Sequence, residues 1–407
     1  MARRLSVARR LSAPPRPPNH RRTADACEKN KEPTMPDNRK KIRRRLIRWL
    51  TPVLLAAAGL VLLALIFRVG SGETEPVKPN VGFVVLGDVH HPGWNASNYE
   101  GLLSACEKLD AHLIVRDHVA ERSGECLKAV RELAAQDCKL IILASYSYPE
   151  EMRPFANEFP DVFFINMASK SYTSNMATYF PRMYQGRYMS GALAGMRSKS
   201  GVIGYVAAMP NAEVLRGINA FLLGARRINP KARVVVAWTN SWEDPERERL
   251  LTERLIREAG ADFITYHQDD AAAAETADRL GVESVMYNAP IPEGPQHVLC
   301  SVNCRWDIFY HNVLRNHLKG ELRVMRTSWI GVDHNAILLS SLSPEITPEI
   351  RTKLDTIRLE LVNHMLIFRG PLYDNQNVLR CKADEVIGDD TLLMDMDWLI
   401  SGVTSLE

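Results

Sequence analysis

Aromatic and polar side chains stand just beyond the ends of apolar runs that are typical of buried β-strands. Trp94 and Asn95 follow the run at 80–87, and Ser145 and Tyr146 end another such run. Ligands of open α/β sheets bind at the carboxyl ends of the strands. An aromatic ring can stack on a flat heterocycle, while amide and hydroxyl groups bind its polar edge. We therefore expect a small-molecule site here, with burial in the core as the alternative for Trp94.

The segment 184–242 leads into a second group of such residues. Its pattern predicts a helix, a strand, a loop, a second helix and a second strand, in that order, and Asn211 could cap the second helix. Arg216 lies one turn into the second helix, where its guanidinium could meet a polar ligand; the alternative is a surface salt bridge. Four further candidates follow predicted strands: Trp238, Trp242, Asp269 and Asn288. Aromatic faces with amide and carboxylate edges suit a heterocycle, with or without a sugar.

Sequence motifs that mark catalysis or cofactor binding are missing. The chain has no G-x-S-x-G motif, no P-loop, and no G-x-G-x-x-G after its first predicted strand. His267 precedes acidic residues, but no second His/Cys pair has the spacing of a metal site. We therefore expect a binding protein rather than an enzyme, with no catalytic residues, no metal and no cofactor.

The N-terminal region differs from the rest of the chain in its charge. Residues 1–50 hold 16 Lys/Arg and 4 Asp/Glu, a net of +12, whereas the remainder carries −9. The basic block leads into 49–67, nineteen residues without a charge. As a helix, a run of this length just spans a bilayer core of about 30 Å. The positive-inside rule then keeps the basic end in the cytoplasm and sends the C-terminal part across the membrane.

These features predict a single-pass protein of the cell membrane with an extracytoplasmic domain. The expected parts are a basic tail at 1–48, an uncleaved transmembrane signal anchor at 49–67 and a linker at 68–79. Residues 1–34 are rich in Arg and Pro without periodicity, so we expect Met35 to be the true start; a disordered tail that touches anionic lipid is the alternative. For the apolar run, the alternative is a cleaved signal peptide. The basic block abuts the membrane and lacks interleaved aromatics, so we expect no nucleic-acid partner.

The remainder of the chain, 80–407, predicts two lobes. Strand and helix patterns alternate along it, which is typical of parallel sheets with helices on both faces. Helices are expected at 149–159 and 348–368, among others. The alternation occurs twice, and about 330 residues are too many for one core. We expect a first lobe at about 80–185 and a second at about 186–301, with the pieces of 302–407 shared between them. Two such sheets joined by a hinge could close on a small molecule.

Several longer segments carry a family resemblance. They are VGFVVLGDVHHPGWN, EFPDVFF, YFPRMYQGRYMSGALAG, the stretch from GVIGYVAAMPN to WTNSWEDP, GADFITYHQDD, FRGPLYDNQ and MDMDWLISGV. With them, 80–403 resembles the basic membrane protein family of ABC-transporter solute-binding proteins, in its purine-nucleoside receptor, Med-like subgroup. The resemblance implies the type I periplasmic binding protein fold, a purine base or nucleoside in the cleft, and delivery to an ABC permease. A sensing domain that regulates a membrane signalling partner is the alternative.

The resemblance also implies roles by position. Trp94 matches the ring that stacks on the base, and Asn95 the amide beside it. The other matches are the loop after the third strand (Ser145, Tyr146), the polar contact of the second-lobe helix (Arg216), the far side (Trp238, Trp242), the sugar or base edge (Asp269, Asn288) and a retained aromatic (Trp306). The family often has Asp where this chain has Asn288, and an amide cannot accept from two ribose hydroxyls as a carboxylate does. This departure favours a base over a nucleoside.

Overall fold

The computed structural model contains two compact parts, which divide after Pro76. The described residues are 38–70, 78–167, 173–289, 291, 295–322 and 328–406. The expected start at Met35, most of the expected tail and most of the expected linker lie outside these residues.

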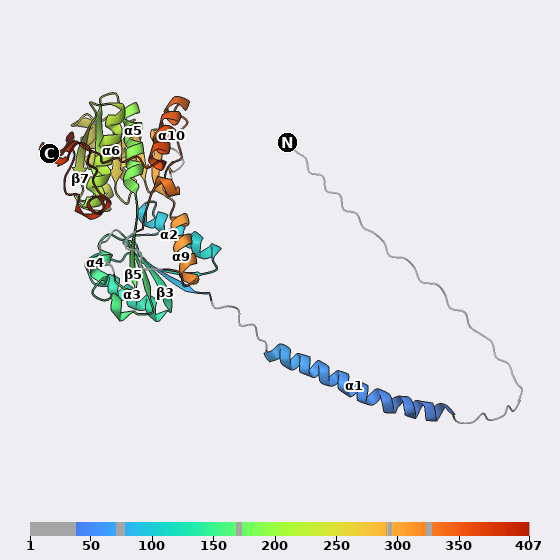
Figure 1. Ribbon diagram of the computed structural model, residues 1–407. Helices are drawn as coiled ribbons and strands as arrows, with labels where there is room; N and C mark the ends of the chain where they lie inside the picture. Colours follow the sequence, from blue (N-terminus) through green and yellow to red (C-terminus); the bar gives the residue numbers. More distant parts are fainter. Residues whose placement is uncertain are drawn as a thin grey trace, which may run out of the picture. The chain divides into compact units, whose positions relative to one another are not determined.

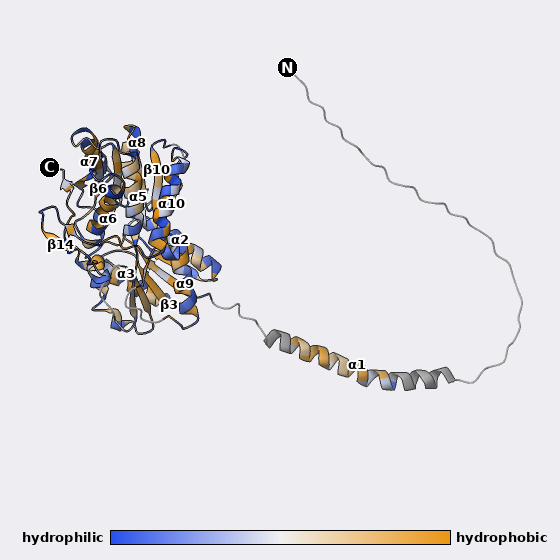
Figure 2. Ribbon diagram, turned by 45° about the horizontal axis from the view of Figure 1, so that its top comes forward, coloured by the Kyte–Doolittle hydropathy of each residue, from blue (hydrophilic) through white to orange (hydrophobic). Residues whose placement is uncertain are grey.

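In the first part, the described residues form one helix, α1 (Asn38–Gly70). Its segment Arg48–Leu65 has a mean hydropathy of 1.9, and none of it is buried. Among the described residues, α1 alone is long and apolar enough to cross a membrane, a test that a signal sequence also passes. Figure 2 shows the apolar colouring through the middle of this helix. The segment overlaps the run 49–67 that the sequence marks as an anchor.

The first lobe of the second part is built on a parallel six-stranded sheet. The strand order is β11-β5-β4-β3-β1-β2. The strands are β1 (Asn80–Val84), β2 (His112–Arg116), β3 (Cys138–Leu143), β4 (Phe163–Met167), β5 (Met176–Pro181) and β11 (Ser328–Ile330). Its longer helices are α2 (Trp94–Lys108), α3 (Glu125–Ala135) and α9 (Trp306–Leu318). Between α3 and β4 lie two short elements, α4 (Tyr148–Met152) and η1 (Ala156–Glu158). Strands such as β3 and β4 are buried on both faces, which explains their continuous apolar sequences.

The second lobe has a seven-stranded sheet in the order β12-β10-β9-β8-β6-β7-β15. Its strands are β6 (Val202–Ala207), β7 (Arg233–Trp238), β8 (Phe263–His267), β9 (Glu283–Tyr287), β10 (Val298–Cys304), β12 (Ile337–Ser340) and β15 (Val403–Ser405). They pair in parallel except for β12, which runs antiparallel to β10. The helices are α5 (Met183–Arg197), α6 (Ala212–Ile228), α7 (Pro245–Arg257), α8 (Ala272–Arg279) and α10 (Pro348–Val362). The C-terminal region adds η2 (Val332–His334), β13 (Leu372–Tyr373), β14 (Leu379–Cys381) and η3 (Thr391–Asp395).

Helices α5 and α6 cover this sheet and pack very closely on one another (Figure 1). A Cβ atom at Gly191 of α5 would overlap the backbone oxygen of Phe221, and one at Gly224 of α6 would overlap that of Tyr188. The close approach of the two backbones therefore requires glycine at both positions. Helix α6 begins as the sequence predicts, because the Asn211 side chain accepts a hydrogen bond from Val214 N.

Some expected elements differ from the observed ones. The helix expected at 149–159 is broken into α4 and η1, because Pro154 lacks an amide hydrogen and blocks continuation of the helix. The helix expected at 348–368 ends at Val362, and the next residues turn, with His364 in a left-handed conformation (φ 62°). Strand β5 and the short C-terminal strands were not expected from the sequence. Strands β5 and β11 belong to the first-lobe sheet and β12 and β15 to the second-lobe sheet, whereas β13 and β14 pair in a separate two-stranded sheet.

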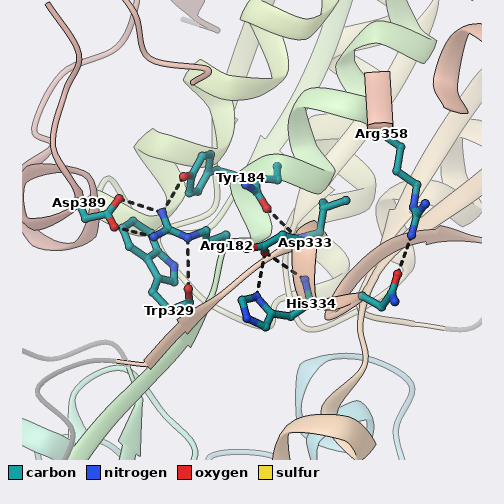
Figure 3. Close-up of polar contacts among 10 residues, drawn as sticks. Arg182, Tyr184, Trp329, Asp333, His334, Arg358 and Asp389 are labelled. Carbon is teal, nitrogen blue, oxygen red and sulfur yellow. Dashed lines mark hydrogen bonds and ion pairs between the residues drawn. The ribbon is translucent and has the colours of Figure 1, made fainter. Parts of the chain in front are cut away.

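The chain crosses between the lobes three times within the described residues: from β5 to α5, from β10 to α9 and from β11 to η2. Arg182, in the first crossover, anchors a group of side chains that we term the hinge cluster: Arg182, Tyr184, Trp329 and Asp389 (Figure 3). Its Nε donates to Trp329 O at 3.2 Å, and its Nη1 to Tyr184 OH at 3.0 Å. Both terminal nitrogens donate to Asp389, at 2.8 and 2.5 Å. The cluster ties two crossovers to the C-terminal region.

Candidate ligand-binding site

A cavity lies between the two lobes, at the carboxyl ends of strands from both sheets. The first lobe lines it with Leu86, Trp94, Asn95, Ser145, Tyr146, Met167 and Phe180. The second lobe lines it with Glu213, Trp242, His267, Asp269 and Tyr287. The structure thus brings together six of the residues singled out from the sequence: Trp94, Asn95, Ser145, Tyr146, Trp242 and Asp269.

The Trp94 ring is held in place by its own hydrogen bond and by a second tryptophan. Trp94 Nε1 donates to Ala144 O at 3.1 Å, so its polar edge is already engaged. The ring meets Trp306 edge to face, with centroids 5.2 Å apart, and lies 6.5 Å from the ring of Phe180. Trp306 itself is buried and does not line the cavity. It was expected in the site, but the structure places it behind Trp94, where it supports that ring.

The first-lobe polar groups differ in what they can offer a ligand. Asn95 Oδ1 is buried and has no hydrogen-bond partner among the described residues. Ser145 Oγ donates to Glu121 Oε1 at 2.6 Å, so the hydroxyl proton is taken and its oxygen can only accept. Burial raises the pKa of Tyr146 to about 12, so its phenol stays protonated at neutral pH and can donate. This wall therefore offers an amide oxygen and a phenol.

The second-lobe wall carries a buried histidine–glutamate pair. His267 Nε2 lies 3.4 Å from Glu213 Oε1, and their side chains are only 6% and 10% exposed. Burial lowers the pKa of His267, although Glu213 opposes this effect, so the imidazole is neutral at pH 7. Burial raises the pKa of Asp269 well above its usual range, and the nearby Glu243 and Glu213 raise it further. Glu213 belongs to the first turn of α6, where the helix dipole favours a carboxylate.

Arg216 does not line the cavity, contrary to the expectation that it contacts the ligand. Its side chain is buried and its Nη1 donates to the backbone oxygens of Leu392 and Leu393, the latter at 3.2 Å. The guanidinium carbon lies 5.6 Å from the centre of the Phe180 ring, which itself lines the cavity. Arg216 is held away from the cavity lining because η3 packs on α6 and its carbonyl oxygens accept hydrogen bonds from the guanidinium.

Two other expected residues also lie elsewhere. Trp238 borders a separate hollow that it shares with Asp374 and Trp398. Asn288 faces a second groove beside α2, with a volume of about 400 Å³. The Asn288 side chain is buried, and neither its Nδ2 nor its Oδ1 has a partner among the described residues.

The lobes touch one another at the rim of the cavity. His91 Nε2 of the first lobe lies 3.5 Å from Asp270 Oδ2 of the second. A Cβ atom at Gly93 would overlap the backbone oxygen of Asp269, so the chains can meet here because residue 93 has no side chain. The cavity volume is only about 30 Å³. A ring-sized ligand can therefore enter only after the lobes have moved apart.

Comparison with known proteins agrees with this architecture. A family model described as ABC transporter substrate-binding protein PnrA-like (Bmp) matches residues 78–376. The chain belongs to the Bmp family. The family and the two-lobed periplasmic binding protein fold predicted from the sequence are thereby confirmed. Bmp proteins are substrate-binding components of ABC transporters, so solute binding is the activity that this fold serves.

Two relatives and a solved structure show the range of the likeness. A purine-binding protein of Brucella abortus is 29% identical over 341 residues, which cover 83% of this chain and 96% of that protein. A putative ABC transporter glucose-binding protein of Haloferax volcanii is 28% identical over 337 residues, 82% of each chain. The crystal structure of an ABC transporter solute-binding protein from Aeropyrum pernix has a TM-score of 0.61 at 15% identity, over 77% of this chain and 95% of that one.

Sequence reasoning missed several residues of this Bmp cavity: Leu86, Met167, Phe180, Glu213 and Tyr287. Glu213 could have been found from the sequence. Ligands bind at helix N-termini, and Glu213 lies in the first turn of α6, whereas Arg216 lies one turn later. Phe180 lies on β5, a strand that the sequence analysis did not assign. Within the described ranges, no group of three His, Cys, Asp or Glu residues could hold a metal ion.

Proposed function

We propose that this Bmp protein captures a purine base or nucleoside between its lobes outside the cytoplasm and delivers it to an ABC permease. The observation that carries the proposal is the cavity itself, which faces aromatic rings from both lobes and keeps unpartnered polar atoms beside them. Trp94 and Phe180 come from the first lobe and Trp242 from the second. Such rings stack on a planar base from either side, and the polar atoms bind its edge.

The charged residues that line the cavity favour an uncharged ligand over a phosphorylated one. Among the residues that the structure describes, no Lys or Arg lines the cavity, whereas Glu213 and Asp269 do. A phosphate would lack a cationic partner there and would face a carboxylate. The Brucella relative that is named for purine binding covers most of the chain and supports the same ligand class. Because the Haloferax relative is named as a putative glucose-binding protein, a sugar is the comparison ligand in any test.

Hinge closure would couple the ligand to the shape of the protein. A ring held between Trp94 and Trp242 contacts both lobes only when the lobes are closed. Because the ligand binds the closed state more tightly than the open state, it shifts the equilibrium towards closure. The backbone contact at Gly93 and the His91–Asp270 pair mark how closely the lobes meet in that state. A permease that recognises the closed form would receive loaded protein.

The N-terminal helix would anchor the protein by a single pass through the cell membrane. Its apolar segment Arg48–Leu65 is long enough for a bilayer, and the basic residues before it favour the cytoplasmic side. The domain after Val77 would then lie outside the cytoplasm, where a substrate-binding protein meets its ligand.

Isothermal titration calorimetry on the full chain in detergent tests the ligand. Adenine, guanine, adenosine, guanosine, inosine and glucose form the panel, and we expect heat from purines and none from glucose. A folded protein that gives no heat with any purine would contradict the proposal. Co-purification with a permease, against co-purification with a kinase or another regulator, distinguishes delivery from the sensing of a ligand for a membrane signalling partner.

A further inference from the structure

The second-lobe side of the cavity offers acceptors for hydrogen bonds and, among its described lining residues, no Lys or Arg. Glu213 faces the cavity with a side chain that is 10% exposed, and its single polar neighbour among the described residues is His267. Because His267 is neutral, its Nε2–H donates to Glu213 Oε1 and leaves Glu213 Oε2 free. Glu213 Oε2 therefore faces the cavity side of the residue without a donor among the described residues, and a ligand can bring one.

The two buried arginines behind this wall do not supply that donor. Arg216 gives its Nη1 to the carbonyls of Leu392 and Leu393. Arg187 gives its terminal nitrogens to Thr265 Oγ1 at 3.2 Å and Tyr266 O at 2.6 Å, with its guanidinium 3.7 Å from the centre of the Tyr287 ring. Neither arginine lines the cavity. Their charges offset part of the Glu213 charge, while the hydrogen bonds that they make go to other groups.

We propose that Glu213 determines specificity in this site by accepting hydrogen bonds from two adjacent N–H groups on the edge of the bound ring. A 2-amino-6-oxopurine, as in guanine, presents such a pair, because its ring N1–H and exocyclic 2-amino group lie side by side. A 6-aminopurine, as in adenine, presents a lone pair at ring N1, which the carboxylate repels. The site therefore takes the guanine class in preference to the adenine class. This inference rests on the proposed purine-binding function and adds the choice among purines.

A paired contact to the Glu213 carboxylate is possible, because Oε1 can accept a second hydrogen bond besides that from His267 and Oε2 has no partner among the described residues. A carboxylate binds two parallel N–H donors most strongly when both of its oxygens are available at one edge. His267 contacts Oε1 and so positions the Glu213 carboxylate without occupying Oε2. The aromatic rings of Trp94 and Trp242 hold the ring plane, while Asn95 Oδ1 remains for a second polar group of the ligand.

The test compares three nucleosides that differ only at this edge. Guanosine carries both N–H groups, inosine keeps the N1–H but lacks the 2-amino group, and adenosine lacks both. Calorimetry on the full chain in detergent should rank them guanosine, inosine, adenosine, with guanosine about tenfold or more tighter than adenosine. Glu213→Gln should weaken guanosine by about 10- to 100-fold and adenosine much less, because a charge-assisted contact is lost.

Glu246→Gln is the matched control, since Glu246 is an exposed residue in the first turn of another second-lobe helix, α7. It should leave all three affinities within about twofold. Adenosine binding as tightly as guanosine to the unaltered protein would overturn the inference while leaving purine capture intact. Guanosine preference that survives Glu213→Gln would also overturn it, whereas absence of binding to every purine would remove the proposed function as well. The ranking on the unaltered chain needs no variant, so it decides the matter even if Glu213→Gln folds poorly.

Discussion

The hinge cluster and the ligand cavity use polar side chains in opposite ways. In the hinge cluster, all three guanidinium nitrogens of Arg182 have partners within the protein. In the cavity, Asn95 Oδ1 and Tyr287 OH have none among the described residues, and Glu213 has a single histidine. Polar groups that the protein satisfies stabilise the fold, whereas groups left open cost stability and are available to a ligand. Substitutions in the two regions should therefore separate stability from binding.

The largest effect is expected in the hinge cluster. Arg182→Ala removes two bonds to Asp389, one to Tyr184 and one to the Trp329 carbonyl, together with the cation–π contact at 4.3 Å. We expect a loss of about 3 kcal/mol in the free energy of unfolding. Urea denaturation of a soluble form that begins at Val77 measures this. Arg305→Ala is the control, because Arg305 is half exposed and pairs with its neighbour Asp307; it should cost about 0.5 kcal/mol or less. Equal losses for both variants would contradict the contrast.

Next comes the aromatic wall of the cavity. Trp94→Ala removes a stacking face, so the affinity for a bound purine should fall by about 1 to 3 kcal/mol. Calorimetry with guanosine measures the loss, and Trp94→Phe, which keeps a ring face, should recover part of it. Trp49→Ala on α1 serves as the control, since Trp49 is exposed and belongs to the other part of the chain. Unchanged affinity in Trp94→Ala would remove this ring from the site.

A smaller effect is expected where the lobes meet. Gly93→Ala places a methyl group against the Asp269 backbone, so the lobes cannot close fully. We expect ligand affinity to fall about tenfold, about 1.4 kcal/mol, because the closed state is the one that binds. Small-angle scattering with saturating ligand should show a larger radius of gyration than for the unaltered protein. Gly388→Ala is the control, because a Cβ atom there meets nothing within 4 Å. Normal closure in Gly93→Ala would show that the contact is dispensable.

The smallest effect concerns pH and a carboxyl of the cavity. Burial raises the folded-state pKa of Asp269, so the folded protein keeps a proton that the unfolded chain loses above about pH 4. The folded state thus binds more protons in this window, and stability falls as pH rises towards the raised pKa. Asp269→Asn should remove this slope and gain about 1 kcal/mol at pH 8.

Urea denaturation at pH 5 and pH 8 measures the change for Asp269→Asn. The exposed control Asp384→Asn should leave the slope as it is. A steeper pH dependence in Asp269→Asn would show that Asp269 stabilises the fold as a carboxylate, which is the opposite of the cavity's expected behaviour.

The sequence predicted the scaffold well because apolar strands and helix caps are local signals. The Asn211 cap and the strand–helix alternation needed no knowledge of distant residues. The strand-end rule also found Trp94, Asn95 and Ser145, which follow from strand position alone. It failed for Arg216, because the carbonyls of Leu392 and Leu393 that bind this side chain come from a C-terminal segment far away in sequence. Pattern reasoning sees which residues stand at a strand end, but long-range packing decides which of them turn towards the ligand.

The two tryptophans of the cavity give the protein a built-in optical signal. Trp94 and Trp242 are two of the seven tryptophans in the chain, and they face the same space from different lobes. Indole emission responds to the polarity of its surroundings, so a base that displaces water between these rings should change both the intensity and the wavelength of fluorescence. Occupancy of the cavity could then be followed in real time without a label.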